Sequence, residues 1–206
     1  MLYIIMCGGD YLDWKIPRHF TKINGETLID RTIRLLKENG VKDIAISSNN
    51  PLFEQFGIPV LKHKNGYTAD GVQITKGYWC ECFYPTSEPT CYIFGDVYFS
   101  SEAIKTIVET ETDDIEFFAS APPFSKDYPK KWEEPFALKV ANTEHLKNAV
   151  KWTIENAGSF YRKPIMWELW QVIKETPLNV ILHNYTAVND YTCDIDRLED
   201  IGKSAP

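Results

Sequence analysis

Asp96 is the first residue whose type and position could support phosphate chemistry. It follows the apolar run CYIF and a glycine, at the end of a predicted buried strand over 91–95. A carboxylate at a strand end, beside a residue that lets a ligand approach the backbone, suits Mg²⁺, which takes one or two carboxylates plus substrate phosphates. The alternative is an aspartate that caps a helix or shapes a turn.

A second acidic group, Asp194 and Asp196, flanks Ile195 near the end of the sequence. If this segment is extended, both carboxylates lie on one face and Ile195 faces the core. Two carboxylates on one face repel each other unless a cation lies between them, which again indicates a metal site. The alternative is local: Asp196 caps a short helix that begins at Arg197, with Glu199 as its capping-box partner.

Positive charge comes from the loop that follows the apolar run 1–6. This loop contains Gly8, Gly9, Lys15 and Arg18, and Arg18 directly follows Pro17. The proline fixes the backbone before the arginine. A basic side chain fixed next to a glycine-rich turn can hold a triphosphate or stabilise charge that develops on phosphorus. The alternative is an ordinary solvated loop.

The elements that must position these residues alternate between strand and helix in the first half of the chain. The second half is less regular. We predict strands at 2–6, 41–47, 58–61, 91–95, 115–119, 136–140, 179–183 and 189–193. We predict helices at 27–39, 70–83, 101–109, 143–157 and 164–175, with short helices from Pro51 and at 197–203. This alternation indicates a parallel α/β sheet, in which ligands bind beyond the carboxyl ends of the strands. The acidic residues and the loop should therefore converge.

Composition limits the other function classes. The chain has 206 residues, is 44% hydrophobic and carries a net charge of −7, which predicts one domain over 1–206 and argues against nucleic-acid binding. Its apolar runs fall short of the ~18 residues of a membrane span. Its five cysteines, an odd number without metal or redox spacing, predict reduced core thiols in a cytoplasmic protein.

The order of these motifs resembles the nucleotidyltransferases of the GT-A-like fold, which include sugar-phosphate nucleotidylyltransferases and CMP-sugar synthetases. The matching segments are PRHFTKINGETLIDRTIRLLKENGVKDIAIS, CYIFGDVYF and DIDRLEDI. The resemblance implies a three-layer α/β/α domain with a mostly parallel, Rossmann-like sheet. It also implies Mg²⁺-dependent transfer of a nucleoside monophosphate from an NTP to a phosphorylated acceptor, a sugar or small polyol, with release of pyrophosphate.

The resemblance also assigns roles to residues. The glycine-rich loop, with Cys7, Gly8 and Gly9, would wrap the nucleotide, and the stretch NGYTADGV would contact the base through Gly66, Thr68 and Asp70. Arg18 would contact the phosphates, and Asp96 with Asp194 or Asp196 would hold the metal. The family's loop has a third glycine and an arginine, where this chain has Asp10 and Tyr11, and Lys15 takes the place of that arginine.

In this scheme Lys15 and Arg18 stabilise the departing pyrophosphate. We expect Lys139 and Arg162 or Lys163 to contact the acceptor, and Trp132, Trp167 and Trp170 to form the walls of its pocket. Core packing or a solvated surface is the more common role for each of these residue types. The four histidines show no mutual metal spacing, and we expect structural roles for them.

Two other function classes stay open. A GT-A glycosyltransferase shares the fold but needs an Asp-x-Asp at the strand end, where this chain reads GDVY. A non-catalytic member would bind a nucleotide or partner through its altered loop. The base, the acceptor and the oligomeric state, a homodimer among the options, also stay open.

Overall fold

The apolar run at the start of the chain forms the central strand of the fold, β1 (Leu2–Met6), in which the side chains from Tyr3 to Met6 are buried. The computed structural model describes residues 1–8, 16–68, 70–120, 133–178, 184–196 and 200. The predicted strand at 179–183 lies outside these residues, and so do the predicted helix at 197–203, apart from Asp200, and the capping-box alternative for Asp196.

Seven strands form the main sheet, in the order β10-β8-β9-β6-β1-β4-β5. Besides β1, these strands are β4 (Ile44–Ser47), β5 (Val60–Leu61), β6 (Thr90–Phe94), β8 (Ile115–Ser120), β9 (Glu134–Val140) and β10 (Thr186–Ala187). Strands β4, β5 and β6 continue the parallel pairing from β1, and β10 is parallel to β8, whereas β9 is antiparallel to both of its neighbours. The mostly parallel sheet predicted from the sequence is confirmed.

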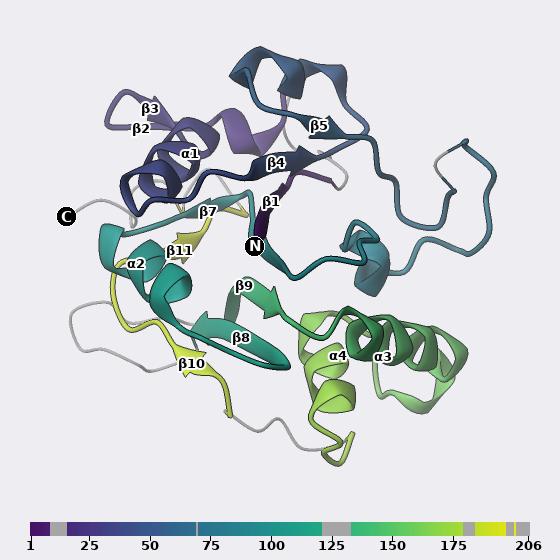
Figure 1. The fold of residues 1–206 in the computed structure, drawn as a ribbon. Coiled ribbons are helices and arrows are strands. Elements are labelled where there is room, and N and C mark those ends of the chain that lie inside the picture. The colour runs from purple at the N-terminus through teal and green to yellow at the C-terminus, as the bar shows by residue number, and fades with distance from the viewer. Residues whose placement is uncertain (9–15, 69, 121–132, 179–183, 197–199, 201–206) are drawn as a thin grey trace.

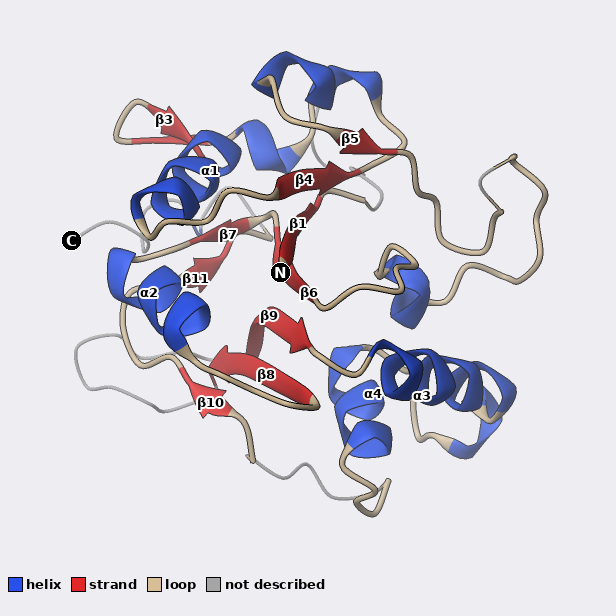
Figure 2. Cartoon of the chain, viewed as in Figure 1, coloured by secondary structure: helices blue, strands red, loops and turns tan. Residues whose placement is uncertain are grey.

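Helices cover both faces of this sheet, which gives three layers (Figures 1 and 2). One side carries α1 (Leu28–Glu38) and α2 (Ser101–Glu109), and the other carries α3 (Thr143–Glu155) and α4 (Met166–Ile173) (Figure 1). The side-chain oxygens of Thr27, Ser100 and Asn142 cap α1, α2 and α3 by accepting backbone N–H groups. Short 3₁₀ helices complete the layers: η1 (Arg18–Phe20), η2 (Pro51–Phe56), η3 (Trp79–Cys82) and η4 (Ala157–Ser159).

The C-terminal acidic segment is held by a small second sheet. Strand β11 (Cys193–Asp194) pairs antiparallel with β7 (Val97–Tyr98), and the Ile195 N–H donates to the Asp96 carbonyl at 3.0 Å. The Ile195 side chain is fully buried, in a cluster with Ile23, Leu28 and Tyr98. The extended backbone predicted for Asp194–Asp196 is therefore present. A third, two-stranded sheet joins β2 (Lys22–Ile23) to β3 (Glu26–Thr27).

The helix predicted over 70–83 is wrong, because only Trp79–Cys82 is helical there. The described residues between 66 and 77 form a loop that is closed at its base by two glycines. The φ angles of Gly66 and Gly77 are +80° and +73°, and a Cβ on Gly66 would lie 2.7 Å from the Gly77 nitrogen. Such backbone angles and so close a crossing are incompatible with a continuous helix.

The five cysteines are free, and Cys7, Cys80 and Cys91 are buried. Burial is the main cause that raises the pKa of each of these three thiols. The predicted reduced core thiols are therefore present at these three positions. Within the described part of the chain, no helix combines the length and the apolar character needed to cross a membrane.

Candidate functional site

A cavity of ≈ 430 Å³ opens at the carboxyl ends of the three central strands. The register places Met6 beside both Ser47 and Phe94, so β1, β4 and β6 end at the same level, and all three residues line the cavity. Arg18 and Asp96 also line it. Parallel α/β sheets bind their ligands at this edge, so Arg18 and Asp96 lie where a ligand of such a sheet would bind.

Arg18 connects two of the predicted metal ligands. Its Nη2 donates a hydrogen bond to Asp96 Oδ2, and its Nη1 donates to Asp196 Oδ1 at 2.6 Å. Burial alone would lower the pKa of Arg18, but the Asp96, Asp194 and Asp196 carboxyls outweigh it and raise that pKa. Arg18 is therefore a permanent positive charge between carboxylates from two distant parts of the sequence.

Asp194 is the most enclosed of the three aspartates. Its Oδ1 is buried and has no hydrogen-bond partner among the described residues, while its backbone N–H donates to Glu134 Oε2 at 3.3 Å. Burial raises the pKa of Asp194 well above its ordinary value, and Asp96, Asp196 and Glu134 raise it further. Asp194 is therefore harder to ionise than a solvated aspartate unless a cation lies beside it.

The chemistry of these side chains suits a divalent cation that also takes ligands from substrate phosphates. The Asp194 carboxyl keeps a buried oxygen without a hydrogen-bond partner in the described residues. Carboxylate oxygens are the ligands that Mg²⁺ prefers. In the arrangement described, no three carboxylate, imidazole or thiolate groups converge closely enough to hold an ion, as far as the described residues show. Arg18 is bonded to two of the three carboxylates.

The predicted glycine-rich loop is described only at its start. Gly8 lines the cavity, whereas Cys7 is fully buried in the core and its carbonyl accepts a hydrogen bond from Ser48 Oγ at 3.0 Å. The Cys7 side chain is thus not part of the cavity wall. Gly9 and Lys15 lie outside the described residues.

The residues predicted to contact the base shape a loop beside the cavity. Gly66 forms the crossing at the base of that loop, and Thr68 Oγ1 accepts the Val72 N–H at 3.0 Å within it. Asp70 is exposed. The cavity wall is instead made by Lys64 and Asn65, just before this loop, and by Gly77 at its end.

Several residues of the cavity were missed by the sequence analysis: Ser47, Asn49, His63, Lys64, Trp79 and Cys82. The sequence held a usable signal for two of these residues. Asn49 and His63 follow strand ends and therefore lie at the ligand-binding edge of the sheet. His63 Nε2 donates to the Glu81 carbonyl at 2.7 Å, which ties this wall to η3.

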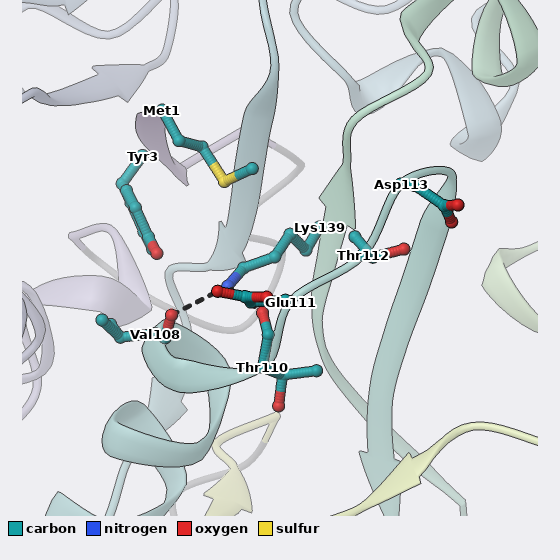
Figure 3. Close-up of a pocket in the computed structure, with 8 residues that line it drawn as sticks. All are labelled: Met1, Tyr3, Val108, Thr110, Glu111, Thr112, Asp113 and Lys139. Carbon is teal, nitrogen blue, oxygen red and sulfur yellow. Dashed lines mark hydrogen bonds between the residues drawn. The ribbon is translucent and has the colours of Figure 1, made fainter.

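Lys139 lies at the opposite edge of the sheet. Its Nζ donates to the carbonyl oxygens of Val108 and Thr110, at 3.0 and 2.6 Å, at the C-terminal end of α2, in a separate pocket of ≈ 630 Å³ (Figure 3). The register of the antiparallel β9 pairs Lys139 with Cys91, at the amino end of β6. The structure therefore does not bring Lys139 to the site as an acceptor contact.

The other residues predicted to contact the acceptor lie in different parts of the structure. Arg162 Nε donates to the buried Glu168 at 2.6 Å, and the neighbouring Lys163 lies 6.0 Å from the ring of Tyr78, next to the cavity residues Gly77 and Trp79. Trp167 and Trp170 are buried and pack on Phe117, as core residues. Trp132 lies outside the described residues.

Solved structures of other proteins are similar to this chain in fold. No family model and no curated protein matches the sequence. Among solved structures, one assigned as a glucose-1-phosphate thymidylyltransferase from Bacillus anthracis, in complex with sucrose, superposes with a TM-score of 0.60 at 13% identity, over 98% of this chain and 93% of that one.

Two structures of HddC from Yersinia pseudotuberculosis are also similar. The complex with GMP-PN gives a TM-score of 0.53 at 13% identity, and the structure without a named ligand gives 0.55 at 15% identity. Both matches cover 98% of this chain and 96% of the other. The chain therefore has the sugar-phosphate nucleotidylyltransferase-like fold that its sequence motifs predict.

Proposed function

We propose that this protein is a Mg²⁺-dependent nucleotidyltransferase that transfers a nucleoside monophosphate from an NTP to a phosphorylated acceptor, a sugar or small polyol. The observation that carries this proposal is that Arg18 and Asp96 line the strand-end cavity and that Arg18 bonds both Asp96 and Asp196. The fold neighbours support it: one is assigned as a thymidylyltransferase, and HddC was solved with a nucleotide analogue.

The reaction is an in-line displacement. An oxygen of the acceptor phosphate forms a bond to the α-phosphorus of the NTP, the bond from that phosphorus to the α–β bridging oxygen breaks, and pyrophosphate leaves with the electron pair. Little covalent chemistry falls to the protein in such a transfer, so its residues act by alignment and by stabilising charge.

Each part of the cavity has a task in this scheme. Gly8, at the end of β1, gives the phosphates access to the backbone, and the wall formed by Asn65, Gly77 and Trp79 would hold the base and ribose. Arg18 would stabilise the negative charge of the departing pyrophosphate, with Lys15 as a second predicted cation. The loop containing Arg162 and Lys163 would face the acceptor.

Asp96, Asp194 and Asp196 would hold the Mg²⁺. The ion would supply charge neutralisation at the phosphates and so make the α-phosphorus easier to attack. We place the reaction in the cytoplasm, where free cysteines such as those of this chain stay reduced.

The test is pyrophosphate release from each NTP in the presence of Mg²⁺ and a panel of sugar and polyol phosphates. We expect release that depends on one NTP and one acceptor and that falls by about 10²-fold or more in Asp96→Asn. Asp113→Asn, which removes a carboxylate from the pocket at the opposite edge, is the matched control. Release of a nucleoside diphosphate from a nucleotide-sugar would instead indicate a glycosyltransferase.

A further inference from the structure

Arg18 is bonded to the same carboxylates that the proposed function assigns to the metal. One guanidinium nitrogen contacts Asp96 at the end of β6, and the other contacts Asp196 beyond β11. The two contacts join segments that are 78 and 178 residues away from Arg18 in the sequence. A guanidinium holds carboxylates in a fixed planar geometry, so this is a defined position.

A divalent cation and this guanidinium exclude each other electrostatically. Each charge-assisted N–H···O bond takes up an oxygen that the ion would coordinate. A positive group in direct contact with the same carboxylates also repels the incoming ion. Asp96 and Asp196 thus cannot hold both cations at full strength.

We propose that Arg18 is the resident counter-ion of the Asp96–Asp196 pair, that a divalent metal ion displaces it, and that the displaced guanidinium then binds the phosphates of the nucleotide. This inference rests on the proposed function for the identity of the phosphate ligand. It gives Arg18 two successive sets of partners and makes the metal and the triphosphate bind with positive coupling.

The surroundings of Arg18 allow such an exchange. Its side chain is 27% exposed and lines the cavity, so an anionic ligand in the cavity lies within its reach. The Asp196 side chain is 62% exposed, which makes that contact the weaker of the two. Asp194 Oδ1 is also buried, without a hydrogen-bond partner among the described residues.

Coupling of this kind is reciprocal. If the metal frees Arg18 for the phosphates, then a phosphate ligand that draws Arg18 away must raise the metal affinity by the same factor. Removing the guanidinium should therefore tighten metal binding when no nucleotide is present, although it would weaken any step that needs Arg18 on the phosphates.

The experiment is a titration of Mn²⁺ into the nucleotide-free protein near pH 8. The loss of the electron paramagnetic resonance signal of free Mn²⁺ measures how much of the ion is bound. We expect Arg18→Met to bind Mn²⁺ about tenfold or more tightly than the wild type, because the ion no longer has to break two charge-assisted bonds. Arg18→Lys should lie between them, since one ammonium replaces the two-armed contact.

Two further variants make the result specific. Arg34→Met removes the same charge from an ion pair with Glu26 on the surface of α1, and it should bind Mn²⁺ as the wild type does. Asp96→Asn should lose the site, which shows that the counted ion is the one in this cluster. Circular dichroism confirms that each variant is folded.

Equal or weaker Mn²⁺ binding by Arg18→Met and Arg18→Lys, relative to the wild type, would overturn the exchange. Tightening of the same size in Arg34→Met would overturn it too, because net charge would then explain the effect. Catalysis is not measured in this titration. A protein that shows the exchange but releases no pyrophosphate would contradict the proposed function and leave the competition between Arg18 and the metal intact.

Discussion

A Cβ on Gly95 would lie 2.6 Å from the carbonyl oxygen of Met6. Gly95 follows β6, Met6 ends β1, and the Gly95 N–H donates to that same carbonyl at 3.0 Å. The added Cβ would also meet Cys7 Sγ at 2.7 Å. Asp96, the next residue, is therefore placed at the cavity by a backbone contact that only glycine allows.

Gly95→Ala should disturb the site and the fold together. Main-chain atoms of β1 cannot move away cheaply, so we expect the free energy of unfolding to fall by about 1–3 kcal/mol, the usual cost of overpacking a core. Nucleotide binding should weaken because Asp96 shifts with Gly95. Urea unfolding and isothermal titration with NTP measure the two effects.

Gly158→Ala is the matched control, since a Cβ there meets no atom within 4 Å. Its unfolding free energy should stay within about 1 kcal/mol of the wild type. A Gly95→Ala protein that is as stable as this control, with unchanged nucleotide affinity, would show that the close contact does not position Asp96.

Glu81 should determine the shape of the proposed nucleotide-binding wall and contribute little to the stability of the fold. Its carboxylate accepts from Thr75 Oγ1 and from the Tyr78 N–H, each at 2.5 Å, on either side of Gly77. Glu81→Ala removes these bonds and frees the base of the 66–77 loop. We expect the KM for the NTP to rise by about tenfold, with kcat less affected.

The comparison for this variant is Glu88→Ala, at an exposed position outside the cavity. Steady-state kinetics of both proteins, with the acceptor saturating, separates an effect on nucleotide binding from a general loss of activity. Unchanged kinetics in Glu81→Ala would show that the loop base does not shape the nucleotide site.

His19 should make the protein sensitive to acid. Burial lowers its pKa from 6.5 to about 4, an effect that Asp96 opposes and Arg18 reinforces. The unfolded chain takes up this proton near pH 6.5 and the folded chain only near 4, so acid favours unfolding in this range. The contribution amounts to about 3 kcal/mol that is lost between pH 6.5 and 4.

His19→Gln removes this titration. We expect the wild type to lose about 3 kcal/mol more unfolding free energy than the variant as the pH falls to 4, measured by urea unfolding at a series of pH values. The difference between the two proteins at pH 8 gives the constant cost of the substitution itself. Parallel stability curves would contradict a buried neutral imidazole.

Lys139→Met should leave the KM for the acceptor unchanged. The lysine caps the end of α2 at the sheet edge opposite the cavity (Figure 3). Arg162→Met, in the loop near Tyr78, is the comparison and should raise this KM by about tenfold. An acceptor KM that rises in Lys139→Met at unchanged nucleotide KM would restore the role predicted from the sequence.

Local signals in the sequence predicted the elements well where they were unambiguous. Thr27 before an apolar stripe predicted α1, and its Oγ1 accepts the Asp30 N–H at 3.0 Å. The segment at 70–83 failed because Gly71 and Gly77 have positive φ angles, which an apolar count does not show. A helix-like composition there is overridden by the turn chemistry of the glycines.

The site was predictable only in part, since strand direction decides which residues reach it. Asp96 follows a strand parallel to β1 and lies at the correct edge, but β9 is antiparallel, which takes Lys139 to the opposite edge. The reversal brings Glu134, at the start of β9, to Asp194 instead. The bonds from Arg18 to Asp96 and Asp196 likewise depend on the assembled fold.

Phosphorus NMR of the protein with an NTP, Mg²⁺ and a sugar phosphate tests the central claim most directly. We expect pyrophosphate and a nucleoside diphosphate-sugar to appear in equal amounts, and neither to appear with Asp96→Asn. Inorganic phosphate or a free nucleoside diphosphate as the product, or equal turnover by Asp96→Asn, would contradict nucleotidyl transfer at this cavity.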